Sequence, residues 1–286
     1  MRYFEPNFLD EALVLLDRFG DGARVLAGAT RLGPQLRERT AGVDTLVNIK
    51  RIRELHEIRL DRGMLNVGAL VTAQQLSDDE LVRTHAPLIG AAAMTMGARQ
   101  LRSVATIGGN VCSGDAAADL SVALLASDAL CAISSIRRGP VETPVERILQ
   151  AGPSGLPSGD LLVALRIPLR PAAIAYQKMT TRRGFEMALV SVAVSLIFEA
   201  VEVRHAHIAL GGAAPTPVRA TGAESALVGR TFSRESAAAA ALIAANADAT
   251  PSDDHRASAL YRRHLVEVLA LRALLDAGRA HGDAAA

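Results

Sequence analysis

The sequence is poor in aromatic residues and in cysteine, and it contains no tryptophan. Aromatic residues make up 3% of the 286 residues, although 50% of the chain is hydrophobic. A core must therefore be filled by alanine, leucine and valine. The two cysteines, Cys112 and Cys131, stand far apart and form no Cys-x-x-Cys pair, so the chain has no thiolate set for an iron–sulfur cluster or a structural zinc. The two could form one disulfide, but we expect two reduced, partly buried thiols.

Long apolar runs and an excess of charge of one sign are also missing. Lys and Arg number 31 and Asp and Glu 30, so the formal net charge is +1. This balance gives no basis for binding nucleic acid or an anionic membrane. No segment approaches the roughly 18–20 apolar residues of a membrane span, and the N-terminus lacks the apolar region of a signal peptide. We therefore expect a cytoplasmic protein with no nucleic-acid partner.

The motifs of several common catalytic sites are absent as well. His205 and His207 share a predicted strand face, and His255 and His264 lie on a predicted helix, but no third ligand is spaced to complete a metal site. The sequence has no Walker A loop, no Gly-x-Gly-x-x-Gly, no nucleophile elbow and no His-Glu-x-x-His motif. Nucleotide hydrolysis, a Rossmann dinucleotide site and zinc hydrolysis are therefore not supported.

Helical and strand patterns alternate over the first 170 residues. We expect a first helix over residues 8–19, with Asn7 as its N-cap and Gly20 at its end. The other predicted elements of this region are strands at 25–27, 46–49, 64–70, 104–107 and 161–167, and helices at 73–83, 87–96 and 119–129. The alternation predicts an α/β region.

The pattern changes after Pro171, where strands are followed by helices. Strands are predicted at 173–178, 188–198 and 203–210, and helices at 222–228, 234–247 and 253–277. This separation indicates an α+β domain. We place the boundary near residue 170, which gives domains 1–170 and 171–286, the first with lobes of about 1–55 and 56–170.

Two glycine clusters, each expected to follow a strand, are candidates for an anion site. The first reads Ala27-Gly28-Ala29-Thr30-Arg31 and the second Thr106-Ile107-Gly108-Gly109-Asn110. A turn of small residues lets consecutive backbone N–H groups converge on an anion, and larger side chains would block its approach. Two such turns could hold the two phosphates of a pyrophosphate, with hydrogen bonds from Thr30, Thr106 and Asn110. Each cluster by itself is also compatible with an ordinary turn.

Three further polar residues are candidates for ligand contacts. Asp119 begins a predicted helix, where a carboxylate either complements the helix dipole or accepts hydrogen bonds from a ligand hydroxyl. Tyr176 and Lys178 lie two residues apart on a predicted strand, and hence on one face of it. They could cover an aromatic ring and place positive charge beside it, or they could be an exposed pair.

Several motifs occur together in an order and at spacings typical of one family. They are Pro6 before Glu11-Ala12-Leu13, Leu26-Ala27-Gly28-Ala29-Thr30, Leu46-Val47-Asn48-Ile49, Gln100-Leu101-Arg102 before Thr106-Ile107-Gly108-Gly109-Asn110, Ala117-Ala118-Asp119-Leu120, Tyr176-Gln177-Lys178 and Tyr261-Arg262-Arg263-His264-Leu265. With this set the chain resembles, over essentially its whole length, the medium FAD-binding subunit of molybdenum hydroxylases. That family includes the flavin subunits of aerobic carbon monoxide dehydrogenase and of bacterial xanthine dehydrogenase-type enzymes.

The resemblance implies an α+β fold and FAD as the cofactor. A two-lobed FAD-binding domain of the vanillyl-alcohol-oxidase/PCMH type would precede a C-terminal α+β domain. The two glycine turns would hold the FAD pyrophosphate and Asp119 would contact the nucleotide. The backbone of Leu162 would face the flavin or adenine, and Tyr176 and Lys178 would lie near the isoalloxazine.

The resemblance also implies partners and an electron-transfer role. A small subunit with 2Fe–2S clusters and a large subunit with a molybdenum cofactor would assemble with the chain as a dimer of heterotrimers. The chain would pass electrons from the clusters to an external acceptor, and its own task would be to place and tune the flavin. The substrate of such a complex would be set by the large subunit, and NAD, oxygen, a quinone or a cytochrome would all be compatible acceptors.

Three positions depart from the family pattern. Ala29 stands where a second glycine is usual, and we expect its φ to be negative, because a methyl group is otherwise poorly tolerated. Arg31 could bond to the pyrophosphate or point to solvent. Asp115 adds a carboxylate near the anion and is expected to weaken its binding. These departures support one alternative, a degenerate structural subunit without flavin, and a second alternative is a stand-alone flavoenzyme of the same superfamily.

Overall fold

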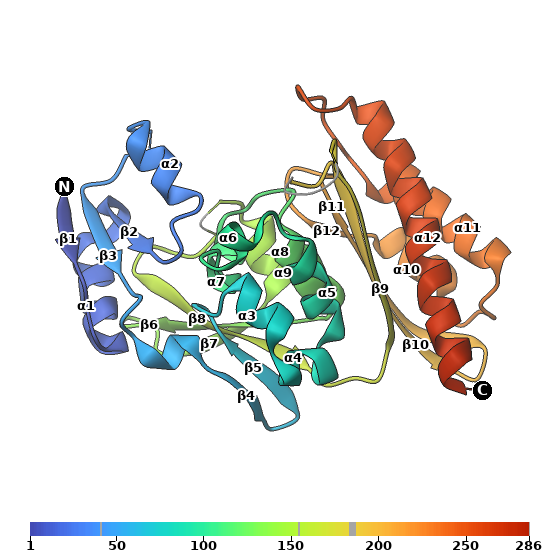
Figure 1. The fold of residues 1–286 in the computed structure, drawn as a ribbon, viewed down its shortest axis with the longest axis horizontal. Coiled ribbons are helices and arrows are strands. Elements are labelled where there is room, and N and C mark those ends of the chain that lie inside the picture. Colours follow the sequence, from blue (N-terminus) through green and yellow to red (C-terminus); the bar gives the residue numbers. More distant parts are fainter. Residues whose placement is uncertain (41, 154, 183–186, 286) are drawn as a thin grey trace.

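Three sheets with helices packed on them form the framework of the chain (Figure 1). The computed structural model describes residues 1–40, 42–153, 155–182 and 187–285. The sheets have three parallel, five antiparallel and four antiparallel strands, in chain order. The part of the chain that carries the three-stranded sheet is called the N-terminal lobe below, that with the five-stranded sheet the second lobe, and that with the four-stranded sheet the C-terminal region.

The N-terminal lobe is a parallel sheet in the order β1–β3–β2, with α1 packed against it. Its elements are β1 (Arg2–Phe4), α1 (Leu9–Phe19), the 3-10 turn η1 (Gly20–Gly22), β2 (Ala23–Leu26), α2 (Leu32–Arg37), β3 (Thr45–Asn48) and the 3-10 turn η2 (Arg53–His56). The first helix ends at Gly20, as predicted, where φ is 51°. The prediction of Asn7 as N-cap is wrong, because Phe8 holds that position without a side-chain bond.

The second lobe is an antiparallel sheet in the order β4–β5–β8–β6–β7, with helices on it. Its strands are β4 (Ile58–Asp61), β5 (Met64–Gly68), β6 (Leu130–Ser135), β7 (Val141–Pro144) and β8 (Asp160–Pro168). Its helices are α3 (Ala73–Asp78), α4 (Glu80–His85), α5 (Pro87–Thr95), α6 (Arg99–Arg102), α7 (Ile107–Cys112), α8 (Asp119–Ala126) and α9 (Val145–Gln150).

Two predictions for this lobe are corrected. The helix predicted over 73–83 is divided at Asp79, which is extended and whose carboxylate accepts a hydrogen bond from the Val82 N–H at 3.0 Å, so that a new helix begins there. The strand predicted over 104–107 does not form. Thr106 makes one isolated bridge with Thr72, and its hydroxyl caps α7 instead.

The C-terminal sheet, in the order β12–β11–β10–β9, stands between two groups of helices (Figure 1). Its elements are β9 (Ala173–Met179), β10 (Val190–Glu199), β11 (Glu202–Gly211), β12 (Val218–Arg219), α10 (Thr221–Leu227), α11 (Arg234–Ile243), the π turn η3 (Ala244–Asp248) and α12 (Ala259–Ala285). Val192 and Val194 belong to the core under α10–α12, whereas Ala193 and Tyr176 pack toward the second lobe. Alternation along the strands thus buries both faces of the sheet.

Helix α8 of the second lobe packs between other helices of that lobe and the C-terminal sheet. All eight of its residues, Asp119–Ala126, are buried, and it contacts α5, α7, β10 and β11. A helix buried on every side has no polar face, and the polar residues that it does carry must find partners inside the protein.

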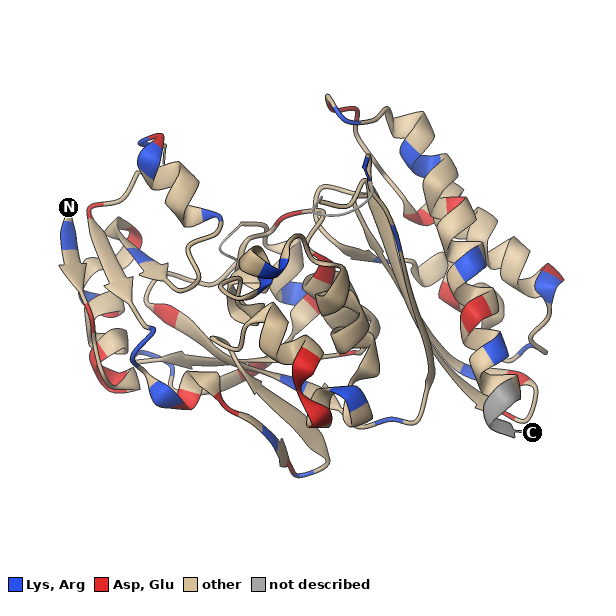
Figure 2. Cartoon of the chain, viewed as in Figure 1, with Lys and Arg blue, Asp and Glu red and all other residues tan. Residues whose placement is uncertain are grey.

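The buried hydrophobic residues are aliphatic, as the composition predicted. Among the described residues none of the fully buried hydrophobic side chains is aromatic, and alanine is frequent under α10–α12. Figure 2 shows charges of both signs interspersed over the chain. Within the described residues, no helix combines the length and the apolar character that crossing a bilayer requires.

The two thiols are expected to be unreactive in the folded chain. Cys112 in α7 and Cys131 in β6 are free, and burial raises the pKa of each to about 12. At pH 8 roughly one thiol in ten thousand is then ionised, and the thiolate is the reactive form. We expect no reaction with dithionitrobenzoate at pH 8 in the time that two thiols react in guanidinium. Rapid labelling of one thiol in the folded chain would contradict this.

Candidate functional site

The two glycine turns, 27–31 and 106–110, lie next to each other where the two lobes meet. A Cβ atom on Gly28 would stand 1.8 Å from the carbonyl oxygen of Val104 and 3.4 Å from the Cα of Ala105. The backbone of the first turn therefore contacts the segment that leads into the second. Only glycine permits this approach, and no sequence pattern indicates Val104 as the contact.

The first turn presents unused backbone donors. In the described part of the chain, the N–H groups of residues 28–31 donate to no acceptor, while the Gly33 N–H closes the turn on the Ala29 carbonyl at 2.7 Å. Ala29 has a φ of 57°, and Arg31 is right-handed with φ −100° and ψ −46°. Free backbone N–H groups of neighbouring residues can together bind an anion. The expected negative φ of Ala29 is wrong, since the chain reverses here between β2 and α2.

Replacing Ala29 with glycine is expected to stabilise the chain by about 0.5–1 kcal/mol. The left-handed region costs a residue with a Cβ about 1–2 kcal/mol, and the extra freedom of glycine in the unfolded chain offsets about half of this gain. Guanidinium unfolding measures the difference. Ala27→Gly is the control, because Ala27 has no positive φ and should lose stability. Equal losses in both variants would contradict the assigned backbone strain.

The second turn has no such free donors. The Ile107 and Gly108 N–H groups donate to the Val71 and Ala69 carbonyls at 2.9 and 3.0 Å. The Gly109 N–H donates to the Thr106 hydroxyl at 3.1 Å, and the Asn110 N–H donates to the Thr106 carbonyl at 2.9 Å. The second turn therefore lacks the free N–H groups expected of an anion site, whereas the first turn has them. The structure uses these donors to dock α7 on the loop after β5.

The second turn offers a bare surface and one side-chain donor instead. Gly109 is exposed, and a Cβ there would meet only the Thr106 hydroxyl oxygen, at 2.9 Å. The Asn110 Oδ1 accepts hydrogen bonds from the Ser121 N–H and hydroxyl at 2.9 and 3.0 Å, which joins α7 to α8. Its Nδ2 makes no hydrogen bond with any described residue, so this amide group is left to donate.

An ion pair links the two lobes beside the first turn. The Arg31 Nη1 lies 2.6 Å from the Asp115 Oδ2, and the two side chains are 49% and 25% exposed. The sequence did not indicate this partner of Arg31 within the protein. The two departures from the family pattern thus compensate each other in charge.

Asp119, Tyr176 and Lys178 form a buried cluster between the second lobe and the C-terminal sheet. The Tyr176 hydroxyl donates to the Asp119 Oδ1 at 2.6 Å, and the Lys178 Nζ lies 2.8 Å from the Oδ2. The carboxyl and ammonium side chains are 7% and 6% exposed, so the alternative of an exposed Tyr–Lys pair is wrong. The Lys178 Nζ also donates to the Thr95 carbonyl at 3.1 Å, a contact without a sequence signal.

Burial dominates the electrostatics of this cluster. It raises the pKa of the Asp119 carboxyl, while the Lys178 ammonium and the Tyr176 hydroxyl oppose the rise. Burial and the neighbouring carboxylate raise the pKa of Tyr176 well above its ordinary value. The tyrosine therefore stays protonated and its hydroxyl donates a hydrogen bond to Asp119, whose two oxygens both have protein partners.

Leu162 lies in the middle of β8, a strand that contacts α7. It pairs with Ile133 of β6 next to a register shift, and its side chain is 3% exposed within the core of the second lobe. Only its backbone groups are therefore candidates for contact with a ligand.

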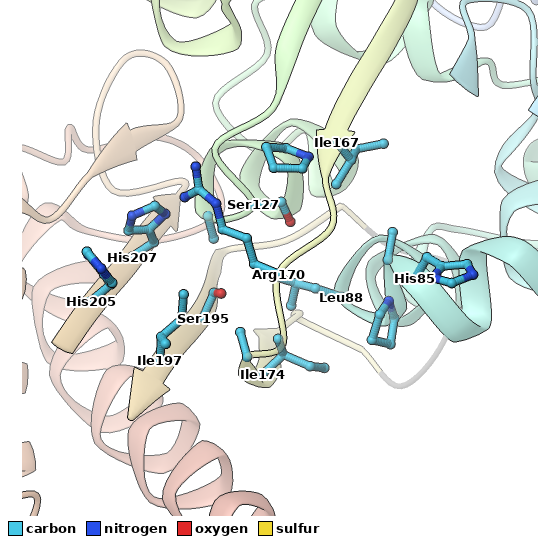
Figure 3. A pocket seen from close by; sticks show the side chains of 15 residues that line it. His85, Leu88, Ser127, Ile167, Arg170, Ile174, Ser195, Ile197, His205 and His207 are labelled. Atoms are coloured by element: carbon cyan, nitrogen blue, oxygen red, sulfur yellow. The ribbon is translucent and has the colours of Figure 1, made fainter. Parts of the chain in front are cut away.

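A separate cavity opens between the second lobe and the C-terminal sheet (Figure 3). His85, Arg170, His205 and His207 contribute polar groups to it, and none of the predicted site residues lines it. Burial, followed by the positive charge of Arg219, lowers the pKa of His207. Within the described residues no three His, Cys, Asp or Glu side chains are placed to hold a metal ion.

Comparison with protein families gives a match over almost the whole chain. Residues 1–170 match the FAD binding domain in molybdopterin dehydrogenase, and residues 174–277 match the CO dehydrogenase flavoprotein C-terminal domain. The carbon monoxide dehydrogenase medium chain of Hydrogenophaga pseudoflava is 31% identical over 277 residues, which cover 95% of both chains. The xanthine dehydrogenase FAD-binding subunit of Escherichia coli is 30% identical over 266 residues, 91% of this chain and 90% of the relative.

Solved structures agree with these relationships. A chain of carbon monoxide dehydrogenase from Hydrogenophaga pseudoflava superposes with a TM-score of 0.93 at 31% identity, over 98% of both chains. A chain of quinoline 2-oxidoreductase from Pseudomonas putida superposes with a TM-score of 0.90 at 27% identity, over 98% of this chain and 97% of the other.

Proposed function

Because the chain belongs to the family of FAD-binding flavoprotein subunits of molybdopterin dehydrogenases, we propose that it binds FAD at the first glycine turn and passes electrons to an external acceptor. The observation that carries the site assignment is the row of unused N–H groups at residues 28–31. Such a row fits a pyrophosphate, which needs donors and excludes bulky side chains. When bound, FAD supplies the redox chemistry, and the protein binds and orients it.

The proposed roles of the other residues follow from their contacts. The Thr30 hydroxyl and the Asn110 Nδ2 are side-chain donors beside the two turns, and Gly109 keeps the surface of the second turn free. The buried Asp119–Tyr176–Lys178 cluster fixes α8 and the end of α5 against the C-terminal sheet. We assign it a positioning role at the flavin and nucleotide.

We propose that the chain occupies the place of the medium subunit in a larger complex. Its relatives are named as medium chains or FAD-binding subunits of dehydrogenases, which implies small and large partner subunits. A small subunit with 2Fe–2S clusters would deliver electrons, a large one would hold the molybdenum cofactor, and the assembly would be a dimer of heterotrimers. We also propose domains 1–170 and 171–286, supported by the change from the five-stranded to the four-stranded sheet between β8 and β9.

The match of residues 174–277 to a CO dehydrogenase flavoprotein domain argues against a stand-alone flavoenzyme. The other alternative is a degenerate structural subunit without flavin. The absorbance spectrum of the purified full chain, followed by release of any bound flavin, distinguishes it from the proposed FAD-binding subunit. We expect flavin bands in the spectrum and about one FAD per chain, because the two glycine turns together make one proposed FAD site. A chain that takes up no FAD, both alone and in complex with its partners, would contradict the proposal.

Replacing Gly109 with tryptophan is expected to abolish flavin retention. The indole would cover the exposed surface of the second turn, and its Cβ would crowd the Thr106 hydroxyl. Flavin content after gel filtration measures the effect. Gly22→Trp is the control, because a Cβ at Gly22 meets no atom within 4 Å. Full flavin content in the Gly109 variant would remove the second turn from the site.

A further inference from the structure

We propose that Asp115 positions Arg31 as a cofactor-binding side chain, so that the ion pair joins the lobes beside the pyrophosphate and determines how tightly FAD is held. The inference rests on the proposed FAD site. It starts from two residues that differ from the family pattern and that lie 2.6 Å apart, from Nη1 to Oδ2, across the lobe boundary.

Asp115 is the fixed member of the pair. The residue before it, Gly114, has a φ of 59°, and a Cβ there would stand 2.5 Å from the Pro153 nitrogen. The carbonyl of the residue after it, Ala116, accepts a hydrogen bond from the Gly212 N–H at 2.6 Å. The Asp115 Oδ1 accepts from the Ala117 N–H at 2.9 Å. The carboxylate is therefore held on a segment anchored on both sides.

Arg31 is the member of the pair whose guanidinium has unused hydrogen-bond donors. Its side chain is 49% exposed and uses Nη1 for Asp115, and its Nε and Nη2 make no hydrogen bond with a described residue. A guanidinium has five N–H donors in a planar fork, so it can hold a carboxylate and a phosphate at the same time. The backbone N–H of Arg31 is itself one of the free donors of the first turn, which places the side chain within reach of the same anion.

The ion pair also determines the net charge beside the proposed pyrophosphate site. The first turn offers neutral N–H donors, and Asp115 alone would repel a pyrophosphate. Arg31 neutralises that carboxylate and leaves its other N–H groups for charge-assisted hydrogen bonds. Loss of Arg31 should therefore do two things, since it removes a donor and exposes the Asp115 charge to the anion.

The test is a titration of the flavin-free full chain with FAD at two NaCl concentrations. We expect Arg31→Gln to weaken FAD binding roughly 30-fold and to reduce its dependence on salt. We expect Asp115→Asn to weaken binding roughly threefold to tenfold by releasing Arg31. In the Arg31→Gln background the same Asp115→Asn change should tighten binding, because it removes an uncompensated negative charge. A merely structural role of Asp115 would weaken binding in both backgrounds.

The control is Arg51→Gln. Arg51 forms an exposed ion pair with Glu5 at 2.9 Å within the N-terminal lobe, with side-chain exposures of 59% and 30%. It should leave FAD affinity unchanged, and all variants should unfold near the wild-type temperature, since exposed pairs contribute little stability. Wild-type affinity in Arg31→Gln, or equal or tighter binding in Asp115→Asn alone, would overturn the inference while the FAD site stands. Failure of the wild type to bind FAD would overturn both.

Discussion

Replacing Gly28 with alanine is expected to weaken FAD binding at least about 100-fold and to destabilise the chain by about 3 kcal/mol. The added Cβ would stand 1.8 Å from the Val104 carbonyl oxygen and 2.8 Å from its carbon. Both atoms belong to the backbone, so no side-chain rotation relieves the clash. The first turn must move away from the second, and its N–H groups then lose their arrangement. FAD titration and guanidinium unfolding measure the two effects.

Gly33→Ala is the matched control for this variant. Gly33 lies in α2, five residues farther along, and a Cβ there would be 3.9 Å from the Ala29 Cβ, an ordinary contact. Alanine in a helix should stabilise by about 0.5–1 kcal/mol and leave FAD affinity unchanged. Wild-type affinity in Gly28→Ala would show that the contact between the two turns is unnecessary for binding.

Replacing Lys178 with methionine is expected to destabilise the chain by about 3–5 kcal/mol at pH 7. Lys178 and Lys50 are the two lysines of the chain, and Lys178 is buried against Asp119 at 2.8 Å. Without the ammonium group, the Asp119 carboxylate would remain in a buried place with the Tyr176 hydroxyl as its donor. Guanidinium unfolding of the full chain measures the loss, and Lys50→Met, at an exposed position, should have little effect.

The pH dependence of this variant has a definite sign. Burial raises the pKa of Asp119, and removing the cation that opposes the rise raises it further. A carboxyl whose pKa is higher in the folded state destabilises that state at pH values above its unfolded pKa, and the penalty shrinks as pH falls toward that value. The deficit relative to wild type should thus be largest near neutrality and smaller at pH 5. An equal deficit at both values would contradict an ionised Asp119.

The parts of the fold that the sequence predicted are those with a clear apolar period or run. Strand β4 was missed because its hairpin turn to β5 is made by Arg62 and Gly63, which have φ values of 49° and 75°. Two positive φ values are typical of a turn that usually carries Asn-Gly or Asp-Gly. At residues 104–107 the β-branched residues favoured a strand. Instead, the Thr106 hydroxyl accepts a hydrogen bond from the Gly109 N–H, and this cap begins a helix.

The sequence indicated candidate site residues but not the contacts that they make with one another. Asp119 and Lys178 are 59 positions apart, and Arg31 and Asp115 are 84 apart, so no local pattern reports either pair. The family resemblance pointed to Asp119, Tyr176 and Lys178 as site residues, but it did not indicate that they bind one another. The second turn had the right composition for an anion site, yet its N–H groups are used to dock α7, and only three-dimensional packing determines that.

The burial of α8 has a consequence for how the two regions can be separated. Every residue of Asp119–Ala126 is buried, and part of that cover comes from β10 and β11. A chain ending near residue 170 would expose this apolar helix to water and leave Asp119 without its lysine. The C-terminal region is therefore no detachable module, and exchanging it between homologous subunits would require the facing surface of α8 to be exchanged with it.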